Sequence, residues 1–213
     1  YINNLIDVCK KDRIDLVIPT IDTDLLVLSE NKARFDAVGT KVMVSSPDMI
    51  RVCRDKNNTF KFFDRCGLKS PMPADNWRKY KLGYPAFIKP KDGSSSINAF
   101  KVCNEKELEL YAAQIKDHIV QPFVEGREYT IDIFCDFNGR PISIVPRERI
   151  QVRAGEVLKT RITMDEIMID EAKKICDAFK PCGSITVQLI RDDKTGEDHY
   201  IEIAVGFKII YNQ

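Results

Sequence analysis

The chain has 213 residues, of which 44% are hydrophobic and 31% charged, as in an ordinary globular protein of one or two domains. Its formal net charge of +1 argues against nucleic acid or an anionic membrane as a partner. No apolar run approaches the about 18 residues of a membrane-spanning helix, and no signal peptide is recognisable.

The cysteines and histidines point to no metal or nucleophile chemistry. The seven cysteines include no pair at C-x-x-C spacing, and most lie on apolar faces. This pattern predicts free thiols in a reducing compartment, so we expect a cytoplasmic protein. His118 and His199 are too few and too far apart in the sequence to suggest a zinc site or a nucleophilic dyad.

The first 50 residues predict a parallel α/β piece. Apolar residues from Ile2 to Cys9 follow helical spacing, and Ser46 with Pro47 favours the start of a later helix. Between them we expect a strand, a helix and a strand at residues 15–19, 25–35 and 41–44. Because such units seldom begin with a helix, we also expect a leading strand before Tyr1 in the parent protein.

The rest of the chain predicts an α+β body with antiparallel strands. Asn104 followed by Glu107 is a helix-capping pattern, and Asn138-Gly139 favours a hairpin turn. Residues 151–163 are polar and rich in Arg and Lys, and we expect a loop there. Helices are expected at 55–66, 104–115 and 168–179, and strands at 118–121, 128–135, 141–145, 184–190 and 200–203. We expect four segments along the chain: the α/β piece at 1–50, a helical connector at 51–84 that begins the α+β body, a nucleotide-lid subdomain at 85–125 and an incomplete C-terminal subdomain at 126–213.

Residues 85–102 organise this body and read PAFIKPKDGSSSINAFKV. Two apolar runs flank a loop of small residues, which predicts strand, loop and strand with Lys89 ending the first strand. Small side chains let successive backbone N–H groups point at one anion, and serine hydroxyls add donors. The stretch therefore indicates a phosphate site, although a polar surface hairpin has the same composition.

Five motifs in order resemble the ATP-grasp superfamily, most closely its carbamoyl-phosphate-synthase type. The similarity runs from about residue 14 to residue 203. The motifs read DK at 55–56 with GLKSP at 67–71, FIKP at 87–90 with its serine-rich loop, QPFVEGREYT at 121–130, VQL at 187–189 and YIEI at 200–203. The resemblance implies ATP bound between two α+β subdomains.

The resemblance also implies contacts to the nucleotide. Lys56 and Lys89 would meet the phosphates, although either could be a surface lysine. A lid would form from Gly93, Ser94, Ser95 and Ser96. The adenine would lie against Gln121, Pro122, Phe123 and Val124, with the Pro122 carbonyl accepting and the Val124 N–H donating. Family members often have Glu where Pro122 stands. Glu128 would accept hydrogen bonds from the ribose.

A metal site and a reaction follow from the same resemblance. Gln188 and Glu202 would be oxygen donors for Mg²⁺, with Mn²⁺ as an alternative. ATP would phosphorylate a small-molecule carboxylate, and an amine or similar nucleophile would attack the acylphosphate. Arg153 and Arg161, with Arg149, would hold the carboxylate or the γ-phosphate, or else form a solvated cluster.

The sequence departs from the family after Glu202. The family continues Asn-Pro-Arg, with the Asn as a metal ligand and the Arg as a transition-state cation, whereas this chain continues Ala204-Val205-Gly206. Three explanations stand: a degenerate ATP-binding or regulatory module, an omitted segment between Ile203 and Ala204, or a C-terminal part lying beyond the sequence. A flavodoxin-like module without ATP would leave the motifs of 85–203 unexplained. The substrate and the oligomeric state, a homodimer included, stay open.

Overall fold

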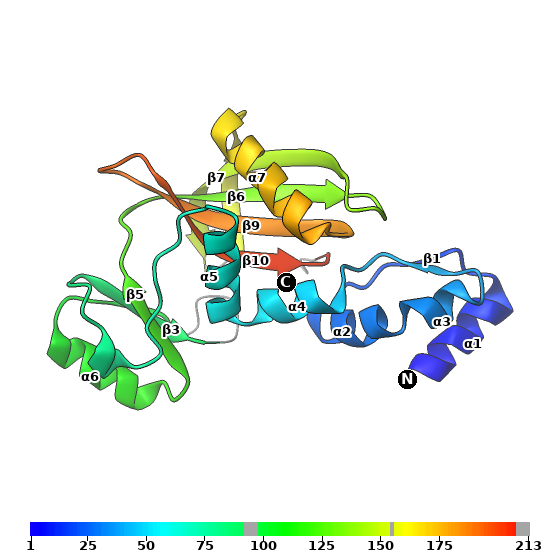
Figure 1. Ribbon diagram of the computed structural model, residues 1–213, viewed down its shortest axis with the longest axis horizontal. Coiled ribbons are helices and arrows are strands. Elements are labelled where there is room, and N and C mark those ends of the chain that lie inside the picture. Colours follow the sequence, from blue (N-terminus) through cyan, green and yellow to red (C-terminus); the bar gives the residue numbers. More distant parts are fainter. Residues whose placement is uncertain (92–97, 154–155, 208–213) are drawn as a thin grey trace.

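The computed structural model describes residues 1–91, 98–153 and 156–207, which form three parts (Figure 1). An N-terminal piece of helices lies at one end, and a small three-stranded sheet with one helix lies at the other. A larger five-stranded sheet lies between and above them, and helices α4 and α5 run beneath it (Figure 1). Gly93, Ser94, Ser95 and Ser96 lie outside the described residues.

The N-terminal piece confirms the predicted parallel α/β arrangement. Leu16 and Val17 pair in parallel with Lys41 and Val42. The single helix expected at 25–35 is two helices, because the first one ends at Asn31. The elements are α1 (Ile2–Asp12), β1 (Leu16–Val17), α2 (Asp22–Glu30), α3 (Lys32–Asp36), β2 (Lys41–Val42) and α4 (Pro47–Arg54).

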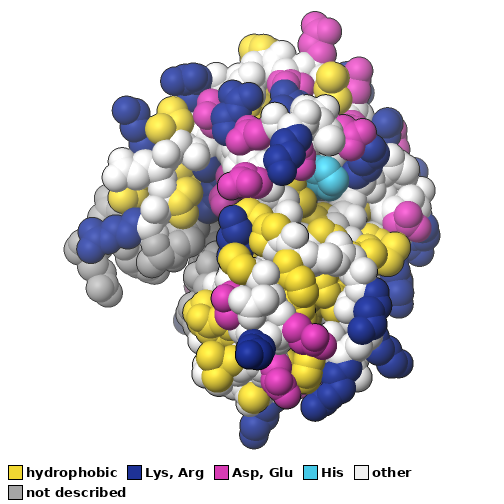
Figure 2. Space-filling view, turned by 90° about the vertical axis from the view of Figure 1, so that its left-hand side faces the viewer, with side chains coloured by type: hydrophobic (Ala, Val, Ile, Leu, Met, Phe, Trp, Pro, Cys, Tyr) yellow, Lys and Arg dark blue, Asp and Glu magenta, His cyan; other side chains and the backbone are white. Residues whose placement is uncertain are grey.

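The small sheet has the strand order β4-β3-β5 and is covered on one face by α6. The helix begins as its capping pattern predicts, because the Asn104 side chain accepts from the Glu107 N–H at 3.0 Å. Figure 2, which looks at this end of the molecule, shows basic and acidic side chains interspersed around apolar ones. The elements are the short helix η1 (Trp77–Lys79), β3 (Ala86–Pro90), β4 (Phe100–Val102), α6 (Glu105–Gln114) and β5 (His118–Pro122).

The large sheet is antiparallel throughout, in the order β10-β9-β6-β7-β8. This arrangement confirms the predicted fold class, an α/β piece followed by an α+β body. The elements are α5 (Lys56–Arg65), β6 (Gly126–Cys135), β7 (Pro141–Arg153), β8 (Glu156–Ile162), α7 (Glu166–Phe179), β9 (Gly183–Asp192) and β10 (Asp198–Val205).

The prediction of a loop at residues 151–163 is wrong. Strand β7 continues to Arg153, and β8 pairs with it antiparallel, so that Arg147 lies opposite Ile162 and Glu148 opposite Arg161. An edge hairpin carries charged side chains because both of its faces meet water along part of its length. The polar composition that suggested a loop is therefore the composition of an exposed sheet edge.

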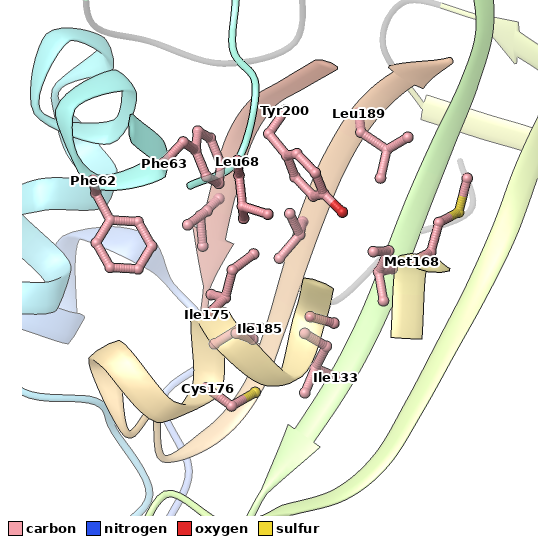
Figure 3. Packing of buried hydrophobic residues seen from close by; sticks show 14 of the residues in the cluster. Phe62, Phe63, Leu68, Ile133, Met168, Ile175, Cys176, Ile185, Leu189 and Tyr200 are labelled. Carbon is pink, nitrogen blue, oxygen red and sulfur yellow. The ribbon is translucent and has the colours of Figure 1, made fainter. Parts of the chain in front are cut away.

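The main core lies on one face of the large sheet, under α5 and α7 (Figure 3). The rings of Phe62 on α5 and Phe179 on α7 stack with their centroids 3.6 Å apart, and Tyr200 is fully buried beside Phe63. Residues on β9 alternate between buried and partly exposed positions along the strand. The face opposite this core is consequently left to polar side chains.

All seven cysteines are free, as predicted, and four of them are buried. Helix α4 joins two cores, because Ile50 packs with the N-terminal piece and Met49 packs under the large sheet. No helix among the described residues is long and apolar enough to cross a membrane.

Candidate functional site

A cavity of about 540 Å³ lies against the polar face of the large sheet. We use "polar face" for the side of the sheet that carries seven side chains, namely Thr130, Asp132, Arg147, Arg149, Thr186, Gln188 and Glu202, all of which line the cavity. Residues 20–22 of the N-terminal piece and Lys56 of α5 close it from other sides. The site is thus built from three regions that are distant in sequence.

Gln188 and Glu202 stand directly opposite each other on β9 and β10. A register shift between Tyr200 and Glu202 produces this pairing. Oxygen donors on adjacent strands suit Mg²⁺, which commonly takes one or two carboxylates from a protein and its other ligands from phosphate and water. The described residues contain no cluster of three or more His, Cys, Asp or Glu with metal-binding geometry. The pair therefore fits a metal that phosphates also hold.

Lys56 lines the cavity together with Glu202, and Lys89 lies near enough to interact electrostatically with both. Burial lowers the pKa of Lys89 to about 8, the positive charge of Lys56 lowers it too, and Glu202 acts in the opposite direction. The Lys56 ammonium lies 3.4 Å from the Lys91 carbonyl oxygen, at the start of the residues that are not described. Two lysines from different elements thus converge near the carboxylate.

Cys53 also lines the cavity, but its thiol is not reactive near neutral pH. Burial, together with the negative charge of Glu202, raises the pKa of the Cys53 thiol to about 12. A thiol with so high a pKa is not a nucleophile near neutral pH, because the thiolate is the reactive form. Cys53 is therefore not a candidate nucleophile at this site.

Arg149 joins two of the predicted ligands. Its Nη1 donates to the Gln188 side-chain oxygen at 3.1 Å and lies 3.2 Å from a carboxylate oxygen of Glu128. The Arg149 side chain is only 6% exposed, whereas that of Glu128 is 47% exposed. The sequence grouped Arg149 with Arg153 and Arg161, and the structure places it on β7 within the cavity lining.

Two further Asp–Arg pairs line the cavity, and the sequence did not reveal them. Arg147 holds both carboxylate oxygens of Asp132, at 2.5 and 3.3 Å, and Thr186 donates to the same carboxylate. Arg54 pairs with Asp22 of α2 at 3.0 Å. Polar residues alternate with apolar ones over residues 128–132, and this pattern indicates a sheet with one polar face. It does not indicate which residues on the neighbouring strands they contact.

The predicted adenine-contacting segment ends β5. The Phe123 N–H donates to the Pro85 carbonyl at 3.1 Å, which makes Phe123 and Pro85 a hydrogen-bonded pair. Backbone groups alternate in direction along an antiparallel strand, so the Pro122 carbonyl and the Val124 N–H point away from β3. Gln121 is 7% exposed and pairs with Phe87 on the face that also carries Lys89. The backbone groups named in the prediction are thus directed away from the sheet.

Arg153 and Arg161 lie elsewhere. Arg153 ends β7 at an exposed position, and Arg161 on β8 is 72% exposed and pairs with Glu148 at 3.7 Å. Neither belongs to the described residues that line the cavity. The cavity brings together Lys56, Arg149, Gln188 and Glu202, with Lys89 within electrostatic range of Lys56 and Glu202. The two arginines remain on the edge hairpin.

Strand β10 runs without a break through Ile203 and Ala204, which pair with Val187 and Thr186. An omitted segment at this point stays one of the three explanations given above. Ala204 and Gly206 line the cavity where the family pattern has Asn and Arg.

A lysine-bearing small sheet and a larger antiparallel sheet with a polar, carboxylate-bearing face define the class of two-subdomain nucleotide-binding folds. The chain belongs to the ATP-grasp family, because residues 53–205 match the model described as "ATP-grasp domain". Residues 1–43 match the model described as "PylC-like, N-terminal domain". The predicted superfamily is confirmed; the finer resemblance to its carbamoyl-phosphate-synthase type stays a prediction.

Individual proteins resemble the chain more distantly. A D-alanine–D-alanine ligase of Desulfovibrio desulfuricans is 29% identical over 158 residues, which are 69% of this chain and 48% of the ligase. The chain spans about a third to a half of the length of the curated relatives it matches, from 32% to 48% for the first four.

Solved structures share the fold at low identity. The biotin carboxylase domain of Hydrogenobacter thermophilus 2-oxoglutarate carboxylase, solved with MgADP, ADP and bicarbonate, aligns over 99% of this chain and 51% of its own with a TM-score of 0.72 and 16% identity. L-amino acid ligase from Bacillus licheniformis aligns over 96% of this chain and 52% of its own with a TM-score of 0.69 and 18% identity. At these identities the likeness shows the fold alone.

Proposed function

We propose that the chain is the nucleotide-binding part of an ATP-dependent ligase that activates a substrate carboxylate as an acylphosphate. The observation that carries the proposal is the direct opposition of Gln188 and Glu202 on a polar sheet face that Lys56 also reaches. Cations beside hard oxygen donors are what a transferable phosphoryl group requires. The family assignment and the ligase relatives support the same activity.

Each part of the nucleotide has a candidate partner. Lys56 and Lys89 meet the phosphates, the ribose hydroxyls bind Glu128, and the adenine edge binds the backbone of Pro122 and Val124. The flanking Phe123 ring lies 4.1 Å from the Lys101 ammonium and 6.2 Å from the Phe87 ring, which gives this end an apolar wall. Gly93 to Ser96 remain the proposed phosphate lid.

Gln188 and Glu202 would hold Mg²⁺, or Mn²⁺, which would supply neutralisation of phosphate charge when bound. The chain's own cations position the reactants. An oxygen of the substrate carboxylate attacks the γ-phosphorus, the bond to the bridging oxygen breaks, and ADP leaves with that electron pair. An amine or similar nucleophile then attacks the acyl carbon and releases phosphate. No residue of the chain changes its covalent state.

We propose an amino acid as the carboxylate substrate. The cavity carries two Asp–Arg pairs, Asp22–Arg54 from helices α2 and α4 and Asp132–Arg147 from strands β6 and β7. Paired opposite charges suit a zwitterion, which presents a carboxylate and an ammonium to separate partners. The D-alanine–D-alanine ligase relative favours the same class. The N-terminal piece would then contribute to specificity through Asp22.

A non-catalytic ATP-binding module is the second candidate. It is favoured by Ala204 and Gly206, which leave β10 without the Asn and Arg of the family pattern. A homodimer is a further prediction, which light scattering on the purified protein tests. The two candidate functions differ in whether bound ATP reacts.

The first test is a calorimetric titration with ATP, with and without Mg²⁺, on wild type, Lys89→Ala and the control Lys159→Ala on the exposed face of β8. Micromolar binding that tightens with Mg²⁺ and is lost only in Lys89→Ala supports the proposed site. ADP release in a mixture of amino acids then separates the ligase from the binding module. Absence of ATP binding by the folded wild type contradicts both.

A further inference from the structure

Phosphoryl transfer requires a cation that meets the charge on the equatorial oxygens of the moving group. In this chain β10 supplies none after Glu202, because Ala204, Val205 and Gly206 follow on the described strand and turn. If the proposed reaction takes place, another side chain in the cavity must provide that positive charge.

Among the described residues, four cationic side chains line the cavity, and they differ in exposure and in partners. Arg54 is 37% exposed and pairs with Asp22, and Arg147 is 22% exposed and is held by both oxygens of Asp132. Lys56, at the start of α5, carries a compact ammonium charge, which suits contact with the phosphates of ATP. Arg149 is the most buried of the three arginines, at 6%, and reaches the amide oxygen of Gln188.

The position of Arg149 is set by the sheet. It stems from β7 and contacts Gln188 on β9, two strands and about 9–10 Å away, so the two side chains meet over β6. Arg149 also meets Glu128 of β6. The guanidinium therefore lies over the middle of the polar face, next to the residue that directly opposes Glu202. A phosphate held beside Gln188 and Glu202 lies within reach of it.

We propose that Arg149 is the catalytic residue that contacts the transferring phosphoryl group, in place of a cation on β10. This inference rests on the proposed function. The planar guanidinium donates two parallel hydrogen bonds to phosphoryl oxygens, an arrangement that lysine does not reproduce. Gln188 and Glu128 hold the side chain in the required orientation.

The test compares two ligands of the same site. ATP represents the ground state, and MgADP with aluminium fluoride represents the planar phosphoryl group during transfer. The variants are Arg149→Gln and Arg149→Lys, and the control is Arg161→Gln, which removes an exposed arginine of the neighbouring strand. Thermal unfolding of each variant reports whether the sheet is intact, and Arg149→Lys retains the charge if Arg149→Gln does not fold.

We expect Arg149→Gln to lose about 10- to 100-fold more affinity for the aluminium fluoride complex than for ATP, with Arg149→Lys intermediate and Arg161→Gln unchanged. Equal losses for both ligands assign Arg149 a structural role and overturn the inference. So does a wild type that binds ATP yet gains nothing from aluminium fluoride. A wild type that does not bind ATP overturns the proposed function itself, which keeps the two failures distinct.

Discussion

Tyr200 and Glu202 are two residues apart on β10, yet their side chains lie on opposite faces of the sheet. Tyr200 is fully buried in the main core, whereas Glu202 lines the cavity. Strict alternation would put both on the same face, and the register shift between them reverses the direction of Glu202. Ile201, the residue between them, also faces the cavity. The bulge is therefore what delivers a carboxylate to Gln188.

The first prediction concerns this carboxylate. Glu202→Gln should abolish the tightening of ATP binding by Mg²⁺ or Mn²⁺, because an amide is a weaker ligand for a hard divalent cation than a carboxylate. ATP affinity without metal should rise slightly or stay the same, since one negative charge is removed from the phosphate site. Calorimetric titration at several metal concentrations measures both effects.

The matched control for Glu202→Gln is Glu197→Gln. Glu197 precedes β10 and forms an ion pair with Lys69 at the surface. Its substitution should leave metal dependence unchanged. If both variants keep the full Mg²⁺ effect, the metal is held by phosphates without Glu202, and the proposed metal pair is wrong.

The second prediction follows from the pKa of Lys89, which burial and Lys56 lower to about 8. In wild type, ATP affinity should fall several-fold between pH 7.5 and pH 9.5, because Lys89 loses its charge in this window while the ATP phosphates are already ionised. Lys89→Arg should remove most of this dependence, since arginine stays charged. Titrations at both pH values measure the difference.

Stability gives an independent check on Lys89. The folded-state pKa lies below the unfolded value near 10.4, so the unfolded chain binds more protons between about pH 8 and pH 10. The contribution of Lys89 to folding therefore becomes more favourable as pH rises through that window. Lys89→Met should unfold at a higher temperature than wild type at pH 7, and its advantage should shrink by pH 10. An unchanged difference would show that Lys89 titrates normally.

The sequence predicted the position of a residue where that position follows from a local motif. It did not predict contacts that depend on the pairing of strands distant in the sequence. Lys89 at the end of a strand and the facing of Gln188 toward Glu202 followed from motifs. The contacts of Arg149 and the Asp132–Arg147 pair did not, because strand register is set by contacts across the sheet. The β7–β8 hairpin was missed for a related reason, since an exposed edge strand and a polar loop have the same composition.

The third prediction concerns Arg191, which ties three elements together. Its guanidinium bonds Asp198 on β10 through two nitrogens, at 2.7 and 2.6 Å, and Asp165 at the start of α7 at 2.5 Å. These groups are at most 20% exposed. Arg191→Met should lower the free energy of unfolding by about 3 kcal/mol, because it leaves two carboxylates without their cation. Urea denaturation measures the loss.

The pH dependence of this variant has a defined sign. The hydrogen bond from Arg191 lowers the pKa of Asp165 below its ordinary value, so its contribution is complete above about pH 4 and is lost on further acidification. Arg191→Met should therefore show a shallower loss of stability below pH 4 than wild type. Arg127→Met is the control, because Arg127 lies 4.0 Å from Asp193 and both are more than half exposed. It should change stability by less than about 1 kcal/mol.

The fourth prediction concerns Gly126, the first residue of β6, which follows the segment proposed to contact adenine. A Cβ atom there would lie 2.0 Å from the Arg191 carbonyl oxygen and 2.8 Å from its carbon, so the beginning of β6 must move away from β9. Gly126→Ala should lower the free energy of unfolding by about 1–3 kcal/mol. It should also weaken ATP binding, because Glu128 is two residues further along the displaced strand. The neighbouring Arg127→Ala, at an exposed position, should do neither. A Gly126→Ala protein with wild-type stability and ATP affinity would show that this end of β6 adjusts without cost and does not position Glu128.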